Sequence, residues 1–181
     1  MWEGSWACIE LLRSPDSWMT SALRDHKVLE LGSGIGLLGL CAAAVGAHVL
    51  VTDVPAVVET TLRANIEANA TDSDAVVANP VAWSGSLPVG DGSIVAQPLN
   101  WLADLTDQTS PNDPRDADVL LAAECVWLQD LVDPFVATVA SLLRVCPARH
   151  TTLTVAFLPL CALTIYLVRV IVFCADNRPI F

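Results

Sequence analysis

The sequence VLELGSGIG at residues 28–36 joins an apolar run to a turn that contains three glycines. The apolar run predicts a buried β-strand, and the glycines let backbone amides approach a ligand at the positive end of a following helix. Residues 37–46 are apolar on nearly all sides, which predicts a helix packed on a sheet. A second strand is expected at 48–53, and its last residue, Asp53, is placed to accept both hydroxyls of a ribose. The stretch therefore predicts a β-α-β unit that forms the front half of a nucleoside-cofactor site.

The glycines alone leave two classes of cofactor open. Gly34, Gly36 and Gly39 have the spacing of the dinucleotide fingerprint, so a nicotinamide cofactor is one alternative. Glu30 favours the other class, because a dinucleotide fold usually keeps apolar residues at the end of its first strand. A carboxylate there suits a cofactor with positive charges of its own, such as S-adenosylmethionine. Carboxylates at two neighbouring strand ends, Glu30 and Asp53, are also poor structural choices without a ligand.

The chain resembles the seven-stranded S-adenosylmethionine-dependent methyltransferases, and more narrowly the lysine methyltransferase-like family that is also called methyltransferase family 16. The resemblance extends over residues 1–149, and Asn100 stands where the family has an acidic residue. The matching motifs, in the family's order, are Gly4-Ser5-Trp6, VLELGSGIGLLGL at 28–40, VTDVPAVVETTLRANIEAN at 51–69, Leu99-Asn100-Trp101 and DVLLAAECVW at 118–127. An ordered set of this kind is far more specific than a glycine pattern.

The resemblance implies an S-adenosylmethionine-dependent, protein-lysine N-methyltransferase with a Rossmann-like class I fold. It places the cofactor on Trp6, Glu30, Gly32, Ser33, Gly34, Gly36, Asp53, Trp101 and Ala122. It places the acceptor amine beside Glu124 and Trp127, which offer a carboxylate contact and a cation–π contact. Structural roles are the alternatives: Glu124 would cap the following helix, and Trp127 would belong to the core. Trp101 would only close its loop, and Trp6 would only cover apolar surface.

The remaining sequence alternates strand and helix patterns. The expected elements are a helix at 56–69 after Pro55, a short strand and loop within 71–92 around Val76 and Val77, a strand at 94–99, a surface loop at 104–116, a helix at 130–145 and a buried strand at 151–157. This order predicts an α/β protein with a doubly wound, mostly parallel sheet. In such sheets the ligand lies at the carboxyl ends of the strands, where all the quoted motifs fall.

The composition favours a domain that does not bind nucleic acid. The 181 residues are 54% hydrophobic, which is enough for a sizeable core, and the formal net charge is −11. Residues 53–133 hold fourteen Asp or Glu and only two cations, Arg63 and Arg115, which disfavours contact with a phosphate backbone. A protein substrate with a basic, lysine-containing acceptor site fits this charge. A solvated acidic surface that only aids solubility is the alternative.

The cysteine spacing and the N-terminus indicate the compartment. The six cysteines include no Cys-x-x-Cys pair and have no histidine cluster nearby, so we expect neither a metal site nor a disulfide framework. The initial MWEGSW lacks the basic region, apolar core and cleavage site of a secretory signal. We therefore expect a cytoplasmic protein, with the nucleus as an alternative.

The C-terminal residues differ from the rest of the chain. Residues 151–168 form a run of eighteen without an acidic or basic side chain, which reaches the length of a membrane-spanning helix. Pro159 interrupts the run, as expected if a buried strand ends there. We expect a methyltransferase domain at 1–158 and an atypical apolar tail at 159–181, which either ends the same domain or forms a membrane segment. Incomplete C-terminal strands would leave a catalytically inactive or truncated cofactor-binding relative, and a membrane segment would give a membrane-tethered methyltransferase-like domain.

Overall fold

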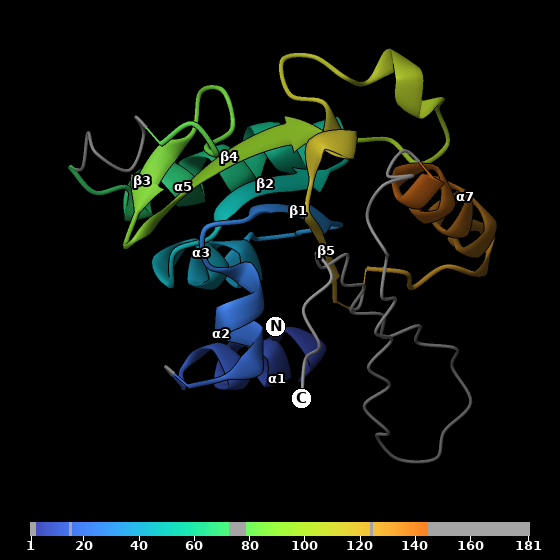
Figure 1. Cartoon of the computed structure of the whole chain (residues 1–181). Coiled ribbons are helices and arrows are strands. Elements are labelled where there is room, and N and C mark those ends of the chain that lie inside the picture. The colour runs from blue at the N-terminus through green and yellow to red at the C-terminus, as the bar shows by residue number, and fades with distance from the viewer. Residues whose placement is uncertain (1–2, 15, 73–78, 124, 145–181) are drawn as a thin grey trace.

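The computed structural model describes residues 3–14, 16–72, 79–123 and 125–144, which form one five-stranded sheet with helices on both faces (Figure 1). The strands are β1 (Lys27–Leu31), β2 (His48–Asp53), β3 (Leu87–Val89), β4 (Gly92–Pro98) and β5 (Val119–Ala122). Their order is β3-β4-β2-β1-β5, in which β4, β2, β1 and β5 are parallel and β3 is antiparallel to β4. The predicted α/β class with a mostly parallel sheet is therefore confirmed.

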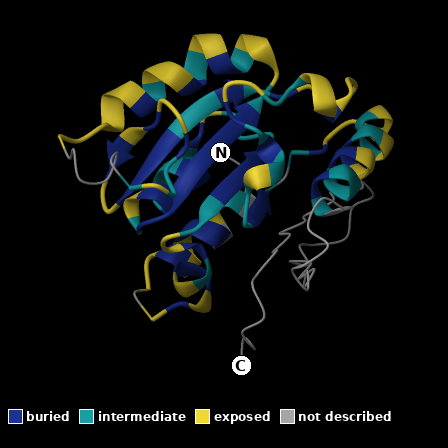
Figure 2. Cartoon of the chain, turned by 45° about the horizontal axis from the view of Figure 1, so that its top comes forward, coloured by how far each residue is buried: buried dark blue, intermediate teal, exposed yellow. Residues whose placement is uncertain are grey.

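The helices cover two separate hydrophobic cores. They are α1 (Glu3–Leu12), α2 (Trp18–Leu23), α3 (Leu37–Ala44), α4 (Pro55–Val57), α5 (Arg63–Asn69) and α7 (Val132–Arg144). Successive residues of a strand point to opposite faces, so Val49 packs in the core under α1, α2 and α3, whereas Leu50 packs in the core beside α7. Figure 2 shows the central strands buried and the outer faces of the helices exposed. This alternation produces the doubly wound arrangement.

Several elements differ from the sequence-based expectations. The predicted helix at 56–69 contains a π-helical turn at Val58–Leu62, and the predicted helix at 130–145 starts later, at Val132, after a 3₁₀ turn at Gln129–Leu131. Within 71–92 the described strand is Leu87–Val89, where Pro88 is tolerated because β3 is an edge strand. The strand expected around Val76 and Val77 lies outside the described residues.

The predicted strand at 151–157 and the tail at 159–181 also lie outside the described residues. Among the helices that the structure describes, none combines the length and the apolar character needed to span a bilayer. The boundary between a domain at 1–158 and a tail therefore stays a prediction.

A buried hydrogen-bond network ties the amino ends of β2 and β4 together. Asn79 Oδ1 accepts from the Val81 backbone N–H at 3.0 Å, which leaves Asn79 Nδ2 to donate to His48 Nε2 at 3.0 Å. His48 therefore carries its proton on Nδ1 and donates it to Ser93 Oγ at 2.9 Å. Trp83 Nε1 donates to the His48 carbonyl at 2.8 Å. The network requires a neutral His48 ring.

We expect the contribution of His48 to the free energy of unfolding, measured as the difference between the unaltered chain and His48→Gln, to fall as the pH drops below the ordinary histidine value of 6.5. Burial lowers the pKa of His48, against a smaller opposing effect of Asp25, and Lys27 lowers it further. The unfolded chain takes up a proton near the ordinary pKa and the folded chain does so only at lower pH. The contribution of the neutral ring to stability is therefore fully present above the ordinary pKa and is lost as the pH falls toward the pKa of the folded chain. Between these two pKa values, this contribution to the free energy of unfolding changes by up to about 1.4 kcal/mol per pH unit.

Chemical denaturation between about pH 8 and pH 5 measures this slope. His48→Gln should remove this contribution, and the opposite effect of Glu30 over the same pH range is present in both proteins and cancels in their difference. A His26→Gln variant, which removes a half-buried histidine whose ring lies outside the network and keeps His48, is the matched control. An unchanged slope in His48→Gln would contradict the prediction.

Candidate functional site

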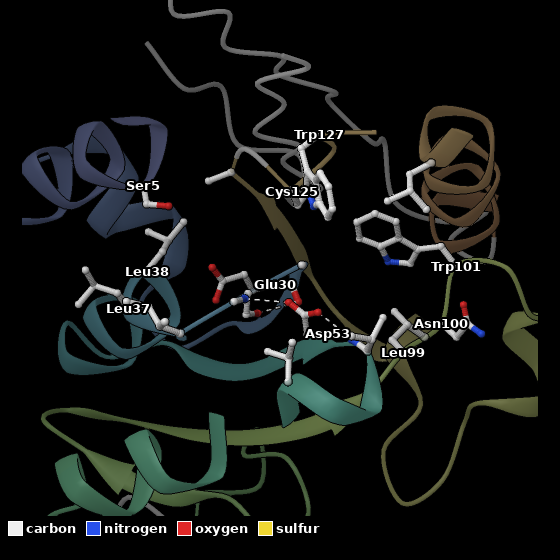
Figure 3. A pocket seen from close by; sticks show the side chains of 18 of the residues that line it. Ser5, Glu30, Leu37, Leu38, Asp53, Leu99, Asn100, Trp101, Cys125 and Trp127 are labelled. Carbon is white, nitrogen blue, oxygen red and sulfur yellow. Dashed lines mark hydrogen bonds between the residues drawn. The ribbon is translucent and has the colours of Figure 1, made fainter. Parts of the chain in front are cut away.

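A cavity of about 490 Å³ lies at the carboxyl ends of the strands (Figure 3). Its walls come from the glycine loop at 32–36 after β1, from residues 53–57 after β2, from 99–102 after β4 and from 123–131 after β5. Parallel strands place these loops at one edge of the sheet although they are far apart in the sequence. The volume is in the usual range for a cofactor or small-molecule site.

Most of the predicted site residues meet in this cavity. The lining includes Glu30, Gly32, Ser33, Gly34, Asp53, Trp101 and Trp127. Gly36 begins α3 as its N-cap and Ala122 is the buried last residue of β5, and neither belongs to the lining. Trp6 is 54% exposed on α1, and its neighbour Ser5 lines the cavity instead. Glu124 lies outside the described residues.

Asp53 holds the glycine loop in place. Its Oδ2 accepts from the Gly34 N–H at 2.8 Å, and its Oδ1 accepts from the Val54 N–H at 2.8 Å. Within the loop, the Gly36 N–H donates to the Ser33 carbonyl at 2.8 Å. Each carboxylate oxygen has a second lone pair, so Asp53 can still accept hydrogen bonds from ligand hydroxyls.

Gly32 allows the loops after β1 and β5 to touch. Its φ of +65° favours glycine, and a Cβ at this position would overlap the Cβ of Cys125. Burial raises the pKa of the Cys125 thiol to about 12, with further increases from Glu30 and Asp53. Cys125 is therefore a neutral thiol that packs against the loop, and the thiolate needed for nucleophilic chemistry is absent at neutral pH.

Glu30 is the most unusual group in the cavity. Only 4% of the residue is exposed, and its Oε2 accepts no hydrogen bond among the described residues. Burial raises the pKa of Glu30 to about 8, against lowering contributions from the Ser33 side chain and the Gly39 backbone N–H, and Asp53 raises it further. A buried carboxyl oxygen that accepts no hydrogen bond is unfavourable for the chain alone. It indicates a partner supplied from outside, such as a cation.

Trp101 and Trp127 occupy different environments. Trp101 lines the cavity and packs edge-to-face on Phe135 of α7, with ring centroids 5.1 Å apart. Trp127 is 65% exposed and is therefore not a core residue. Figure 3 shows both rings on the side of the cavity opposite Leu37 and Leu38 of α3.

The sequence did not identify several lining residues. Ile35, Val54 and Leu102 are exposed apolar side chains on three different loops around the cavity. Each lies within one residue of a predicted site residue, so adjacency to the strand ends was the available signal. Ser5 likewise lies next to Trp6, whereas Leu131 carried no such signal, because tertiary packing brings it to the cavity.

The lining residues favour a cationic ligand. Two carboxyl groups, Glu30 and Asp53, face the cavity, and the described lining includes no lysine or arginine. A dinucleotide would bring a pyrophosphate close to these carboxylates, whereas a ligand with an ammonium or sulfonium group would offset their charge. In the described part of the chain, no group of three His, Cys, Asp or Glu side chains could hold a metal ion.

Comparisons with known proteins identify similar methyltransferases. A family model described as lysine methyltransferase matches residues 1–91. The protein-lysine N-methyltransferase EFM6 of Saccharomyces cerevisiae is 33% identical over 111 residues, which cover 58% of this chain and 39% of EFM6. The mouse protein N-lysine methyltransferase METTL21A is 29% identical over 120 residues, which cover 66% of this chain and 45% of METTL21A. The matched segments thus span less than half of each relative.

One solved structure with a similar arrangement is a precorrin-6y C5,15-methyltransferase from Geobacter metallireducens GS-15. The likeness covers 85% of this chain and 74% of that chain at 10% identity, with a TM-score of 0.41. A likeness at this level supports no conclusion about the chain.

Proposed function

The chain belongs to the lysine methyltransferase family, and we propose that it binds S-adenosylmethionine in the cavity and transfers the methyl group to a lysine of a protein. The main support is the buried Glu30 carboxyl, which lacks a hydrogen-bond partner on Oε2 and lies beside a cavity of cofactor size. A nicotinamide dinucleotide carries no net positive charge that would offset both carboxyl groups, and its pyrophosphate would lie close to them. No feature of the sequence beyond the glycine turn favours hydride transfer.

The cavity residues suit the parts of S-adenosylmethionine. Asp53 would accept the ribose hydroxyls while it holds Gly34, and Glu30 would offset the positive charge of the cofactor. The apolar side chains of Val54 and Leu99 would contact the adenine ring. The glycines at 32, 34 and 36 would let the backbone approach the ligand. Trp6 and Ala122, which do not line the cavity, would lie at the edge of the proposed site.

When bound, S-adenosylmethionine would supply a methyl group on a sulfonium. A neutral amine would attack the methyl carbon in line as the carbon–sulfur bond breaks, the thioether would leave as S-adenosylhomocysteine and the proton would pass to solvent, so no strong catalytic base is required. The chain's task is then to align the amine and to exclude water. Trp127 offers an exposed ring face that suits a lysine ammonium through a cation–π contact. We propose that Glu124 adds a carboxylate contact to the same amine. The apolar side chains of Ile35, Val54 and Leu102 would exclude water when a substrate segment covers the cavity.

The proposed partner is a protein with a basic acceptor segment and not a nucleic acid. The net charge of −11 supports attraction of a lysine-containing segment. The names of EFM6 and METTL21A describe both relatives as acting on lysine in proteins. Action in the cytoplasm or the nucleus is part of this proposal, and membrane attachment through 159–181 is not favoured.

Calorimetric titration with S-adenosylmethionine tests the proposal. We expect the chain to bind, and Asp53→Ala to weaken binding by about 10- to 100-fold, because hydrogen bonds to a charged acceptor contribute about 1.5–3 kcal/mol. Asp91→Ala is the matched control, since Asp91 forms an exposed ion pair with Arg24 outside the cavity lining. NAD should not compete.

The outcomes separate the alternatives. Binding by the unaltered chain together with methylation of a lysine-containing basic peptide would support the full proposal. Binding without methyl transfer would favour the catalytically inactive relative. A folded chain that binds no S-adenosylmethionine would contradict the proposal.

A further inference from the structure

Asn65 connects α5 to the tip of the glycine loop. Its Nδ2 donates to the Ile35 carbonyl at 2.8 Å, although the two residues are 30 apart in the sequence. Ile35 lies between Gly34 and Gly36, lines the cavity and is 51% exposed. Asn65 itself lies outside the lining, so any effect on a ligand must act through the loop.

The loop needs such a contact because its glycines let the peptide groups of the loop rotate. Gly34 has φ +55° and Gly36 has φ +79°, and glycine peptide groups turn with little steric resistance. The peptide group between Ile35 and Gly36 is held at both ends. The Gly36 N–H donates to the Ser33 carbonyl at 2.8 Å, and the Ile35 carbonyl accepts from Asn65. Without Asn65, the carbonyl end of this group would lose its fixed partner.

The segment that carries Asn65 is itself anchored next to the loop. The π-helical turn at Val58–Leu62 precedes α5, and single π turns occur frequently at functional sites. Leu62 and Ile66 are buried, and a Cβ on Gly36 would lie only 2.7 Å from Leu62 Cδ2. This packing fixes the position of Asn65 relative to the loop.

Asn65 and Asp53, which belong to one continuous segment of the chain, hold two peptide groups of the loop that are separated by a single peptide group. Asp53 accepts from the Gly34 N–H, and Asn65 donates to the Ile35 carbonyl. We propose that Asn65 is a positioning residue, which fixes the glycine loop in the conformation that binds the cofactor. This inference rests on the proposed function of the cavity.

Asn65→Leu tests the inference, because leucine has the same branching and number of side-chain heavy atoms, removes the donor and carries no charge. Leucine also has a higher helix propensity than asparagine, which offsets the exposed hydrogen bond that is lost, so the stability of the variant should change little. We expect affinity for S-adenosylmethionine to fall about 3- to 10-fold, which corresponds to one lost hydrogen bond. Hydrogen exchange without cofactor should be faster at the Gly36 amide. Affinity should therefore fall without a matching loss of stability. A residue with only a structural role would change both together.

Asn69→Leu is the matched control. Asn69 lies one turn later on α5, and its Nδ2 donates to the Asn65 carbonyl at 2.8 Å without contacting the loop. It receives the same change in residue type and should keep the affinity and exchange rates of the unaltered chain. Equal affinities of the unaltered chain and Asn65→Leu would overturn the positioning role while leaving the proposed function intact. If the unaltered chain bound no S-adenosylmethionine, the proposed function would fall, and the positioning role with it.

Discussion

Glu30→Gln is expected to stabilise the ligand-free chain by about 3 kcal/mol at neutral pH. The pKa of Glu30 is about 8 in the folded chain against an ordinary value of 4.5. Between these values the folded state keeps a proton that the unfolded state releases, so the contribution of Glu30 to stability is highest below the ordinary pKa and falls as the pH rises toward 8. Glutamine does not ionise and escapes this loss.

The pH trend is more diagnostic than the absolute change, since a buried amide also needs hydrogen-bond partners. Denaturation of both proteins between about pH 5 and pH 8 should show a difference that grows with pH. Glu67→Gln, at an exposed position of α5, is the control for a change on the surface. A constant difference across this range would show that burial does not perturb Glu30.

The same substitution should weaken cofactor binding, by about 10- to 100-fold, because a buried contact to a charged group is lost. A cationic ligand favours the ionised form of Glu30, so binding to the unaltered chain at neutral pH should release protons. Titrations in buffers with different ionisation enthalpies measure that release. The Glu30→Gln variant should show a smaller release. Stability and function thus make opposite demands on this residue.

The sequence was sufficient to predict the fold class and much of the site. The second strand, predicted at 48–53, is β2 (His48–Asp53), because β-branched apolar residues there end at a polar strand tip. Glu30 and Asp53 could be placed together from the sequence alone, since parallel neighbouring strands end at the same edge of the sheet.

Features that depend on tertiary packing could not be predicted. Hydrophobic periodicity does not distinguish a π-helical turn such as Val58–Leu62 from an α-helical one. Cys125 contacts Gly32 because the loops after β5 and β1 lie side by side, and their relative position is determined only in the folded sheet. Likewise, the sequence does not place Asn65 at the site, and only its hydrogen bond to Ile35 connects it to the glycine loop.

Gly39→Ala is expected to destabilise the chain by about 1–3 kcal/mol, although alanine is normally the better helix former. Gly39 lies in α3 against the sheet, and a Cβ there would overlap Val51 Cγ1 and lie 2.7 Å from Glu30 Oε2. Gly85→Ala is the contrasting control, because Gly85 has φ +74° but no atom within 4 Å of an added Cβ. It should show backbone strain alone and leave cofactor affinity unchanged.

Two consequences of Gly39→Ala can be separated, because the added methyl group meets two neighbours. Val51→Ala removes the overlapping methyl groups, so Gly39→Ala should become nearly neutral for stability in that background, with a coupling of about 1–3 kcal/mol in the double-mutant cycle. Gly39→Ala should also weaken cofactor affinity, because the added methyl group crowds Glu30, and this loss should remain in the double variant since the contact with Glu30 remains. Additive stability changes would show that Val51 does not limit the space at Gly39. A restored affinity would show that the helix, and not the Glu30 carboxyl, transmits the effect to the cavity.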